Sequence, residues 1–215
     1  MIDKLILSYE YVKDDDLNIC VNNGVAYQHD VTYKKDYDGK YFEYCQTKYF
    51  DTNKKALINA KRWNFIFQTV GSTADNILDI GIGDGSFMTH FGRAKGYDVD
   101  EMAVEWLKEN NLFADDLSQF KYYTMWDVIE HIENPDEYLQ YLYTDNYLFL
   151  SLPIFEDLNK IRNSKHYRPG EHFYYFTKNG LIAWMKEKGF ELRNIGDFEI
   201  HAGRESIYDF AFMKK

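Results

Sequence analysis

The spacing of apolar residues changes along the chain and predicts alternating helices and strands. Between residues 51 and 71, apolar side chains recur at helical spacing, capping-type residues open the segment and a glycine ends it. This pattern predicts one amphipathic helix. From residue 76 onward, short apolar runs alternate with helical stretches. Such alternation is typical of a parallel sheet wound with right-handed crossovers.

The expected elements of this region are short strands with helices between them. Strands are predicted at 76–80, 96–99, 120–126 and 146–152, and helices after Gly85 and over 101–110 and 135–142. A further helix over 178–188 ends at Gly189 and precedes two strand-like runs, 190–200 and 206–215, joined by a turn that contains Gly203. These two runs predict an antiparallel hairpin that closes one edge of the sheet.

The first 50 residues are rich in tyrosine and lack this alternation. Alternating apolar and polar residues from Leu5 to Val12 suggest a hairpin. We interpret residues 1–50 as an N-terminal cap or lid and residues 51–215 as the single core domain, since 215 residues suffice for one α/β core.

Composition narrows the classes of function. The formal net charge of -10 disfavours a nucleic-acid partner, which usually requires clustered basic residues. Cys20 and Cys45 have no second cysteine or histidine at metal-ligand spacing, so neither a disulfide nor a zinc site is expected. The N-terminus does not resemble a secretory signal, and the longest apolar run, 147–155, is too short to span a bilayer. A soluble, cytoplasmic protein is expected, whereas the oligomeric state cannot be predicted.

The sharpest chemical signal is LDIGIGDGSF at 78–87, in which an apolar strand containing Asp79 runs into Gly81, Gly83 and Gly85 before a helix. Glycines allow a ligand to approach the backbone closely, and the loop amides then face it. The acid in the strand favours a ligand with an ammonium group.

This segment resembles the first motif of class I S-adenosylmethionine (SAM)-dependent methyltransferases. The resemblance implies that the loop wraps the methionine part of SAM and that Asp79 orients it. It also implies a Rossmann-like α/β fold with a mostly parallel seven-stranded sheet, an antiparallel strand in the C-terminal hairpin and helices on both faces.

Further acids follow in the order that this family shows. Asp98, after a short strand, resembles the second-motif acid that accepts the ribose hydroxyls, with Tyr97 in place of a small aliphatic residue. Asp100 is more simply a helix cap. Asp115 or Asp116 is expected to accept the adenine amino group, although both also suit a solvated turn.

The stretch WDVIEHIENP resembles the family's run after the fourth strand, although Phe120 and Lys121 replace its frequent Phe-Asp. The resemblance implies that Trp126 and Asp127 lie at the cofactor. His131 is a candidate general base, because imidazole titrates near neutrality, and a structural histidine at a helix end is the alternative.

The long polar and aromatic insertion between Pro153 and Phe176 resembles the segment that overhangs the acceptor pocket in this family. It supplies His172, the second candidate base. A solvated crossover is the alternative for this insertion. No spacing compels a metal site, so none is predicted.

The sequence therefore predicts a SAM-dependent methyltransferase that acts on an O, N or C nucleophile of a small molecule. One alternative is a SAM-binding regulatory protein without catalysis. Two less favoured alternatives are a nucleic-acid methyltransferase, whose Asn/Asp-Pro-Pro-aromatic tetrad is replaced here by WDVIEH, and an NAD(P)-dependent dehydrogenase, which Asp79 and the antiparallel tail disfavour.

Overall fold

A computed structural model describes residues 3–20, 23–28, 40–48 and 52–215. In chain order its elements are α1 (Lys4–Leu7), β1 (Val12–Asp14), β2 (Leu17–Cys20), β3 (Val25–Gln28), α2 (Lys40–Lys48), α3 (Thr52–Val70), β4 (Ile77–Ile80), α4 (Ser86–Phe91), β5 (Ala94–Tyr97), α5 (Glu101–Glu109), the 3₁₀ turn η1 (Leu117–Gln119), β6 (Tyr122–Trp126), η2 (Ile129–His131), α6 (Asp136–Leu139), β7 (Tyr147–Pro153), η3 (Leu158–Asn163), β8 (Tyr174–Phe176), α7 (Lys178–Glu187), β9 (Phe190–Gly196), α8 (Phe198–His201) and β10 (Ile207–Lys214).

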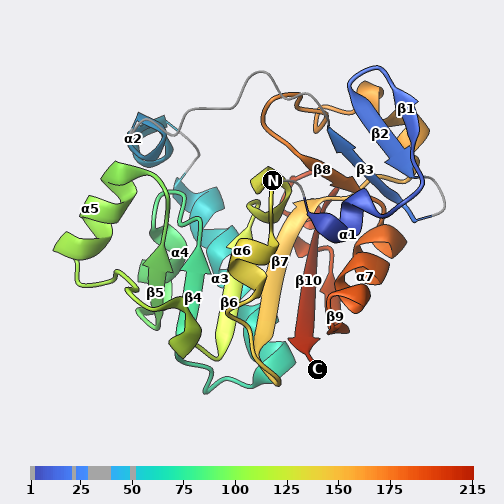
Figure 1. The fold of residues 1–215 in the computed structure, drawn as a ribbon. Coiled ribbons are helices and arrows are strands. Elements are labelled where there is room, and N and C mark those ends of the chain that lie inside the picture. The colour runs from blue at the N-terminus through green and yellow to red at the C-terminus, as the bar shows by residue number, and fades with distance from the viewer. Residues whose placement is uncertain (1–2, 21–22, 29–39, 49–51) are drawn as a thin grey trace.

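The main sheet has the strand order β5-β4-β6-β7-β10-β9 within the described residues. β4 is parallel to β5 and β6, and β6 is parallel to β7. β10 is antiparallel to both β7 and β9, between which it lies. The predicted Rossmann-like α/β architecture with an antiparallel C-terminal strand is thereby confirmed (Figure 1).

The prediction of seven strands is wrong, because the described main sheet has six. The apolar run before Asp115 contributes only an isolated bridge between Phe113 and Gly96. Three apolar residues followed at once by an exposed acidic turn are too few to continue a ladder beside β5. The run 190–200 is also shorter as a strand than predicted, because α8 begins at Phe198.

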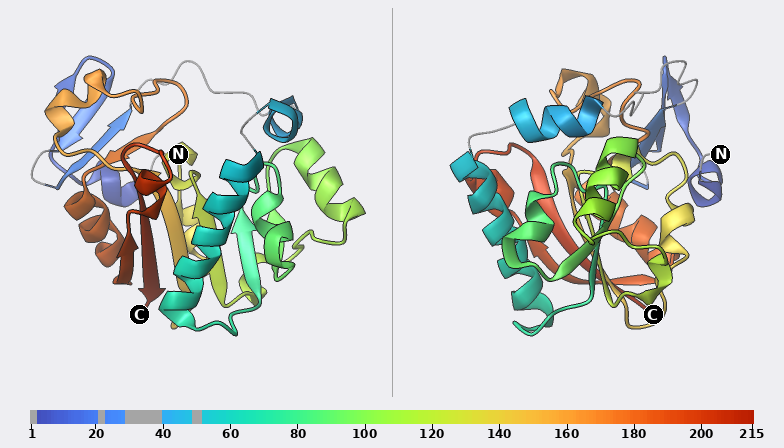
Figure 2. Two further views of the ribbon diagram at one scale, coloured as in Figure 1. Left: turned by 180° about the vertical axis from the view of Figure 1, so that it is seen from behind. Right: turned by 90° about the vertical axis from the view of Figure 1, so that its left-hand side faces the viewer.

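Helices cover both faces of this sheet, with α3 on one side and α6 and α7 on the other (Figure 2). Alternation along the strands builds the two cores. In β7, Leu148, Leu150 and Leu152 face the core beneath α7, whereas Phe149 faces the core beneath α3. None of the described helices is both long and apolar enough to cross a membrane.

The predicted hairpin over Leu5–Val12 is wrong, because residues 4–7 form α1 and the first strand starts only at Val12. Buried Asp3 explains the helix, since its carboxylate accepts the Leu5 amide as an N-cap. The same carboxylate accepts the indole N–H of Trp184 at 3.0 Å and pairs with Lys188 at 2.8 Å. The start of the described chain is therefore anchored to α7.

A second sheet, in the order β1-β2-β3-β8, joins the N-terminal segment to the insertion after β7. Its side chains form a small core with that insertion, built from Leu17, Ile19, Ala26, Phe155, Leu158, Ile161 and Tyr175. Figure 1 shows this sheet above the carboxyl ends of the parallel strands. The N-terminal strands and the insertion after β7, which are far apart in sequence, thus form one unit over the edge where α/β sheets bind ligands.

The turn before β3 packs against α7 so closely that only glycine fits at the contact. A Cβ on Gly180 would lie 1.9 Å from the carbonyl oxygen of Gly24. We expect Gly180→Ala to lower the free energy of unfolding by about 2 kcal/mol, because overpacking outweighs the gain in helix propensity. Urea denaturation measures this, and exposed Asn179→Ala in the same helix turn is the control. A Gly180→Ala protein as stable as the control would contradict this packing.

Candidate active site

A cavity of about 650 Å³ opens at the carboxyl ends of β4, β5 and β6. Its wall also includes residues of α3, of the insertion and of the segment that follows α8. Open α/β sheets bind ligands at this edge, and the volume lies in the usual range of small-molecule sites. This is therefore the candidate active site.

The glycine loop follows β4, as predicted, and forms part of the cavity wall. Gly81, Gly83 and Gly85 all have positive φ, at 74°, 59° and 75°. Gly81 has no room for a side chain, since a Cβ would lie 2.5 Å from Val128. A Cβ on Gly83 would meet no atom within 4 Å, so the backbone there borders open space.

Asp79 is fully buried at the base of this loop and accepts the hydroxyl of Thr124 at 2.6 Å. Burial raises the pKa of Asp79 to about 7, although the Thr124 hydrogen bond opposes the shift. The carboxyl group therefore changes charge near neutrality. A cationic group in the cavity would favour its ionised form.

Asp98 lies in the cavity wall directly after β5. Its carboxylate accepts the amides of Ile82, Val99 and Asp100 at 2.8 to 2.9 Å, which ties the glycine loop to the next strand. Burial raises the pKa of Asp98 against these hydrogen bonds. A carboxylate offers about four acceptor sites, so one remains for a ligand.

Three predicted cofactor residues lie outside the cavity wall. Gly85 packs against Trp106 and lies outside the cavity wall. Asp115 and Asp116 are exposed and also lie outside it, and Asp116 caps η1 through Ser118. Asp100 caps α5 by accepting the amides of Met102 and Ala103, as predicted.

Asp127 follows β6 with φ of 59°, a left-handed conformation that is uncommon for residues with side chains. Arg204 holds its carboxylate with two hydrogen bonds of 2.8 and 3.0 Å, and Arg62 adds a contact of 3.3 Å. Burial would raise the pKa of Asp127, but the two guanidinium groups outweigh burial and lower it. Both arginines also bind Glu199, which is fully buried.

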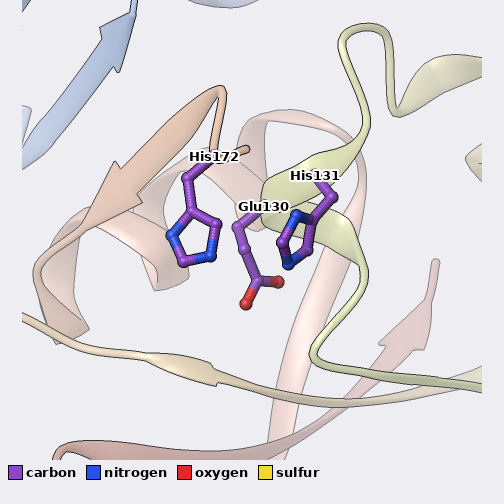
Figure 3. A group of neighbouring side chains, drawn as sticks. All are labelled: Glu130, His131 and His172. Atoms are coloured by element: carbon purple, nitrogen blue, oxygen red, sulfur yellow. The ribbon is translucent and has the colours of Figure 1, made fainter. Parts of the chain in front are cut away.

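The two predicted histidines meet in the wall of the cavity, beside Glu130 (Figure 3). The rings of His131 and His172 are perpendicular, with centroids 4.5 Å apart. The backbone amide of Phe173 donates to the carbonyl of Glu130 at 2.8 Å, which fastens the insertion to η2. Burial, and then the proximity of His131, lowers the pKa of His172 to about 2, so its imidazole is neutral.

His131 has a defined tautomer. Its Nδ1 lies 3.0 Å from the backbone carbonyl of Glu171. A carbonyl only accepts hydrogen bonds, so Nδ1 carries the hydrogen and the lone pair of the neutral ring lies on Nε2.

A family model described as a methyltransferase domain matches residues 41–195. The chain belongs to this methyltransferase-domain family. The family membership favours the methyltransferase interpretation of the glycine loop over the dehydrogenase one. No curated protein sequence matches the chain.

Solved methyltransferases share the fold of this domain. A SAM-dependent methyltransferase from Thermotoga maritima, described as a possible histamine N-methyltransferase, is 16% identical, with a TM-score of 0.53 over 76% of this chain and 94% of its own. Magnesium protoporphyrin IX methyltransferase from Synechocystis PCC 6803, solved with S-adenosylhomocysteine, is 15% identical, with a TM-score of 0.52 over 80% and 97%. A glycopeptide N-methyltransferase bound to sinefungin is 11% identical, with a TM-score of 0.52 over 73% and 86%.

Sequence reasoning missed several residues in the cavity wall of this methyltransferase domain. Lys55, Asn59 and Arg62 form a polar stripe on α3 that reaches the cavity. Lys55 pairs with Asp84, and Asn59 donates to Ser86 at 2.9 Å, so α3 supports the glycine loop. Their i, i+4, i+7 spacing is a usable signal. Arg204 has none, because only the fold brings it to Asp127.

The ion-pair network predicts a large effect of removing one arginine. Arg204→Met leaves Asp127 and buried Glu199 with one cation between them, so we expect the free energy of unfolding to fall by about 3 kcal/mol. Chemical denaturation measures the change. Arg193→Met, which removes an exposed pair with Glu191, is the control and should have little effect. Equal stabilities for the two variants would show that the network contributes nothing.

Proposed function

We propose that the chain is a SAM-dependent methyltransferase that modifies a small molecule. One observation carries the proposal: in a methyltransferase-domain chain, Gly81, Gly83 and the acids Asp79 and Asp98 border a single cavity. The two histidines line the same cavity. Several solved neighbours are named as complexes with SAM, S-adenosylhomocysteine or sinefungin, which supports the same ligand class here.

The residues present fit SAM. The open backbone at Gly83 admits a ligand, buried Asp79 suits the ammonium group, and Asp98 keeps one acceptor site for a ribose hydroxyl. When bound, SAM supplies an activated methyl group on a sulfonium. The chain then has to position the acceptor and exclude water. Trp126 and Asp127, at the end of β6 in the cavity wall, are proposed to border the cofactor.

The acceptor is proposed to enter at the end formed by His131, His172 and the insertion. His166, Arg168 and Glu171 of the insertion also line the cavity. The named acceptors of the neighbours are small molecules or peptides, and the net charge of -10 does not favour nucleic acid. We propose that residues 1–50 act as a cap on this side, since β1–β3 share a sheet with the insertion.

A SAM-binding protein without methyl transfer is the second candidate. A [4+2]-cyclase has the same fold, with 13% identity and a TM-score of 0.51 over 75% of this chain and 80% of its own. The fold alone therefore does not fix the reaction. SAM binding without turnover of any screened acceptor would favour this candidate.

Isothermal titration with SAM, and separately with NAD and NADP, tests the cofactor. We expect micromolar SAM binding that is lost in Gly83→Arg, which fills the open space, and in Asp98→Ala. Gly92→Arg is the matched control, because Gly92 has a similar φ of 63° and open space but lies outside the cavity wall. Binding of a nicotinamide dinucleotide in place of SAM would overturn the proposal.

The raised pKa of Asp79 predicts pH-dependent binding. At a pH below the Asp79 pKa of about 7 the carboxyl group is neutral, and at a higher pH the ionised group attracts the ammonium of SAM. Affinity should therefore rise up to about eightfold from pH 6 to pH 7.5, with release of a proton on binding at the lower pH. Titration in buffers of different ionisation enthalpy measures both. Asp79→Asn should flatten the profile, and an unchanged slope in this variant would assign the pH dependence to another group.

A further inference from the structure

We propose that Glu130, His131 and His172 bind one divalent transition-metal ion in the wall of the cavity. One donor atom from each residue can be chosen so that all three lie within 4.8 Å of one another. Figure 3 shows the two imidazole rings on either side of the Glu130 carboxylate. Two histidines and one carboxylate are the protein ligands of several catalytic zinc sites.

The burial of Glu130 fits a metal ligand. The residue is 2% exposed, and its Oε2 has no hydrogen-bond partner among the described residues. Burial raises the pKa of Glu130 well above its usual range, which favours the protonated form when no cation is bound. Buried carboxylates that are ionised are normally paired or bound to metals. Two arginines of the same cavity wall are already committed, since Arg62 and Arg204 bind Asp127 and Glu199. A metal ion between Glu130 and the two rings would satisfy Oε2.

His131 is already oriented as a metal ligand. Its Nδ1–H donates to the carbonyl of Glu171, which fixes the ring and leaves the lone pair on Nε2. Metal-binding histidines usually have such an outer hydrogen bond to a carbonyl or carboxylate. His172, 5% exposed in the same wall, is fixed by the chain segment that Phe173 fastens to η2.

The spacing of the donors requires a modest closure. Metal bonds of about 2.1 Å in tetrahedral geometry place ligand atoms roughly 3.4 Å apart, so donor atoms within 4.8 Å of one another have to approach by up to about 1.4 Å. Rotation about the side-chain torsions of Glu130 and His172 can provide this.

The donor set also selects the metal. Imidazole suits Zn²⁺, Fe²⁺ and Ni²⁺, between which Co²⁺ falls in affinity order, whereas Mg²⁺, Ca²⁺ and Mn²⁺ prefer oxygen ligands. We therefore expect Zn²⁺ and Co²⁺ to bind and Mg²⁺ to bind much more weakly.

Three protein ligands leave at least one coordination position open, as in catalytic rather than structural zinc sites. The three residues line the same cavity as Gly81, Gly83 and Asp98, so this position faces the bound molecules. If the chain transfers methyl groups as proposed, the metal ion would coordinate an oxygen atom of the methyl acceptor at this position. A hydroxylated acceptor is thereby favoured, since a metal ion orients and acidifies a bound hydroxyl.

Co²⁺ titration of the chelator-treated full chain tests the site. We expect one Co²⁺ per chain, with visible d–d absorption bands, displaced by Zn²⁺ but not by Mg²⁺. His172→Ala and the near-isosteric Glu130→Gln should each weaken Co²⁺ binding at least about tenfold. His166→Ala is the matched control, because His166 lines the same cavity but bonds to the carbonyl of Glu205, and it should bind Co²⁺ as the wild type does.

The outcomes separate this inference from the proposed function. SAM titration and circular dichroism on each variant show whether it is folded and binds cofactor. SAM binding without stoichiometric Co²⁺ binding, or Co²⁺ binding that His172→Ala and Glu130→Gln leave unchanged, would overturn the metal site and leave the methyltransferase proposal intact. Co²⁺ binding without SAM binding would support the metal site and remove its assignment to methyl transfer.

Discussion

The partly buried ion-pair network around Asp127 is the constraint on which the cavity depends. Asp127 turns the chain out of β6 in a left-handed conformation. This turn places Glu130 and His131 of η2 in the same cavity wall as the glycine loop. Arg62 comes from α3 and Arg204 from the segment before β10, so the network fastens three distant parts of the chain at one point. Buried charges demand paired, hydrogen-bonded partners, and this demand fixes the geometry of the cavity wall.

The charges of this network balance. Arg62 and Arg204 face two acids, Asp127 and Glu199. Asp209 lies in the strand that follows Arg204, and neither of its carboxyl oxygens has a hydrogen-bond partner among the described residues. Burial and the charge of Glu199 raise the pKa of Asp209 to about 9, so it is protonated at neutral pH. A third anion beside two guanidinium groups would leave a net charge in the interior, and protonation avoids it.

Local pattern in the sequence is enough to predict one part of this site. The strands before Gly81, Asp98 and Asp127 follow from short apolar runs, and the glycine loop follows from its own spacing, so the amino-acid sequence alone places these residues at one edge of the sheet. Prediction fails where the outcome depends on distant residues. Asp3 folds residues 4–7 into α1 because Trp184 and Lys188 hold its carboxylate, a contact that no local pattern shows. Two other features can be interpreted correctly from local sequence. The apolar run before Asp115 is too short for a strand, and the polar stripe on α3 has helical spacing.

The proximity of Glu130 to His172 shows why sequence spacing does not predict the proposed metal site. Glu130 and His131 are adjacent in sequence, but His172 reaches them only because the insertion folds back and Phe173 donates to the Glu130 carbonyl. The insertion is held there by the β3–β8 pairing, and β3 depends on the close approach of Gly24 to Gly180. β3 therefore helps to hold the insertion whose residues line the cavity. Arg62 and Arg204 are committed to Asp127 and Glu199, and neither guanidinium group hydrogen-bonds the Glu130 Oε2 in the same wall.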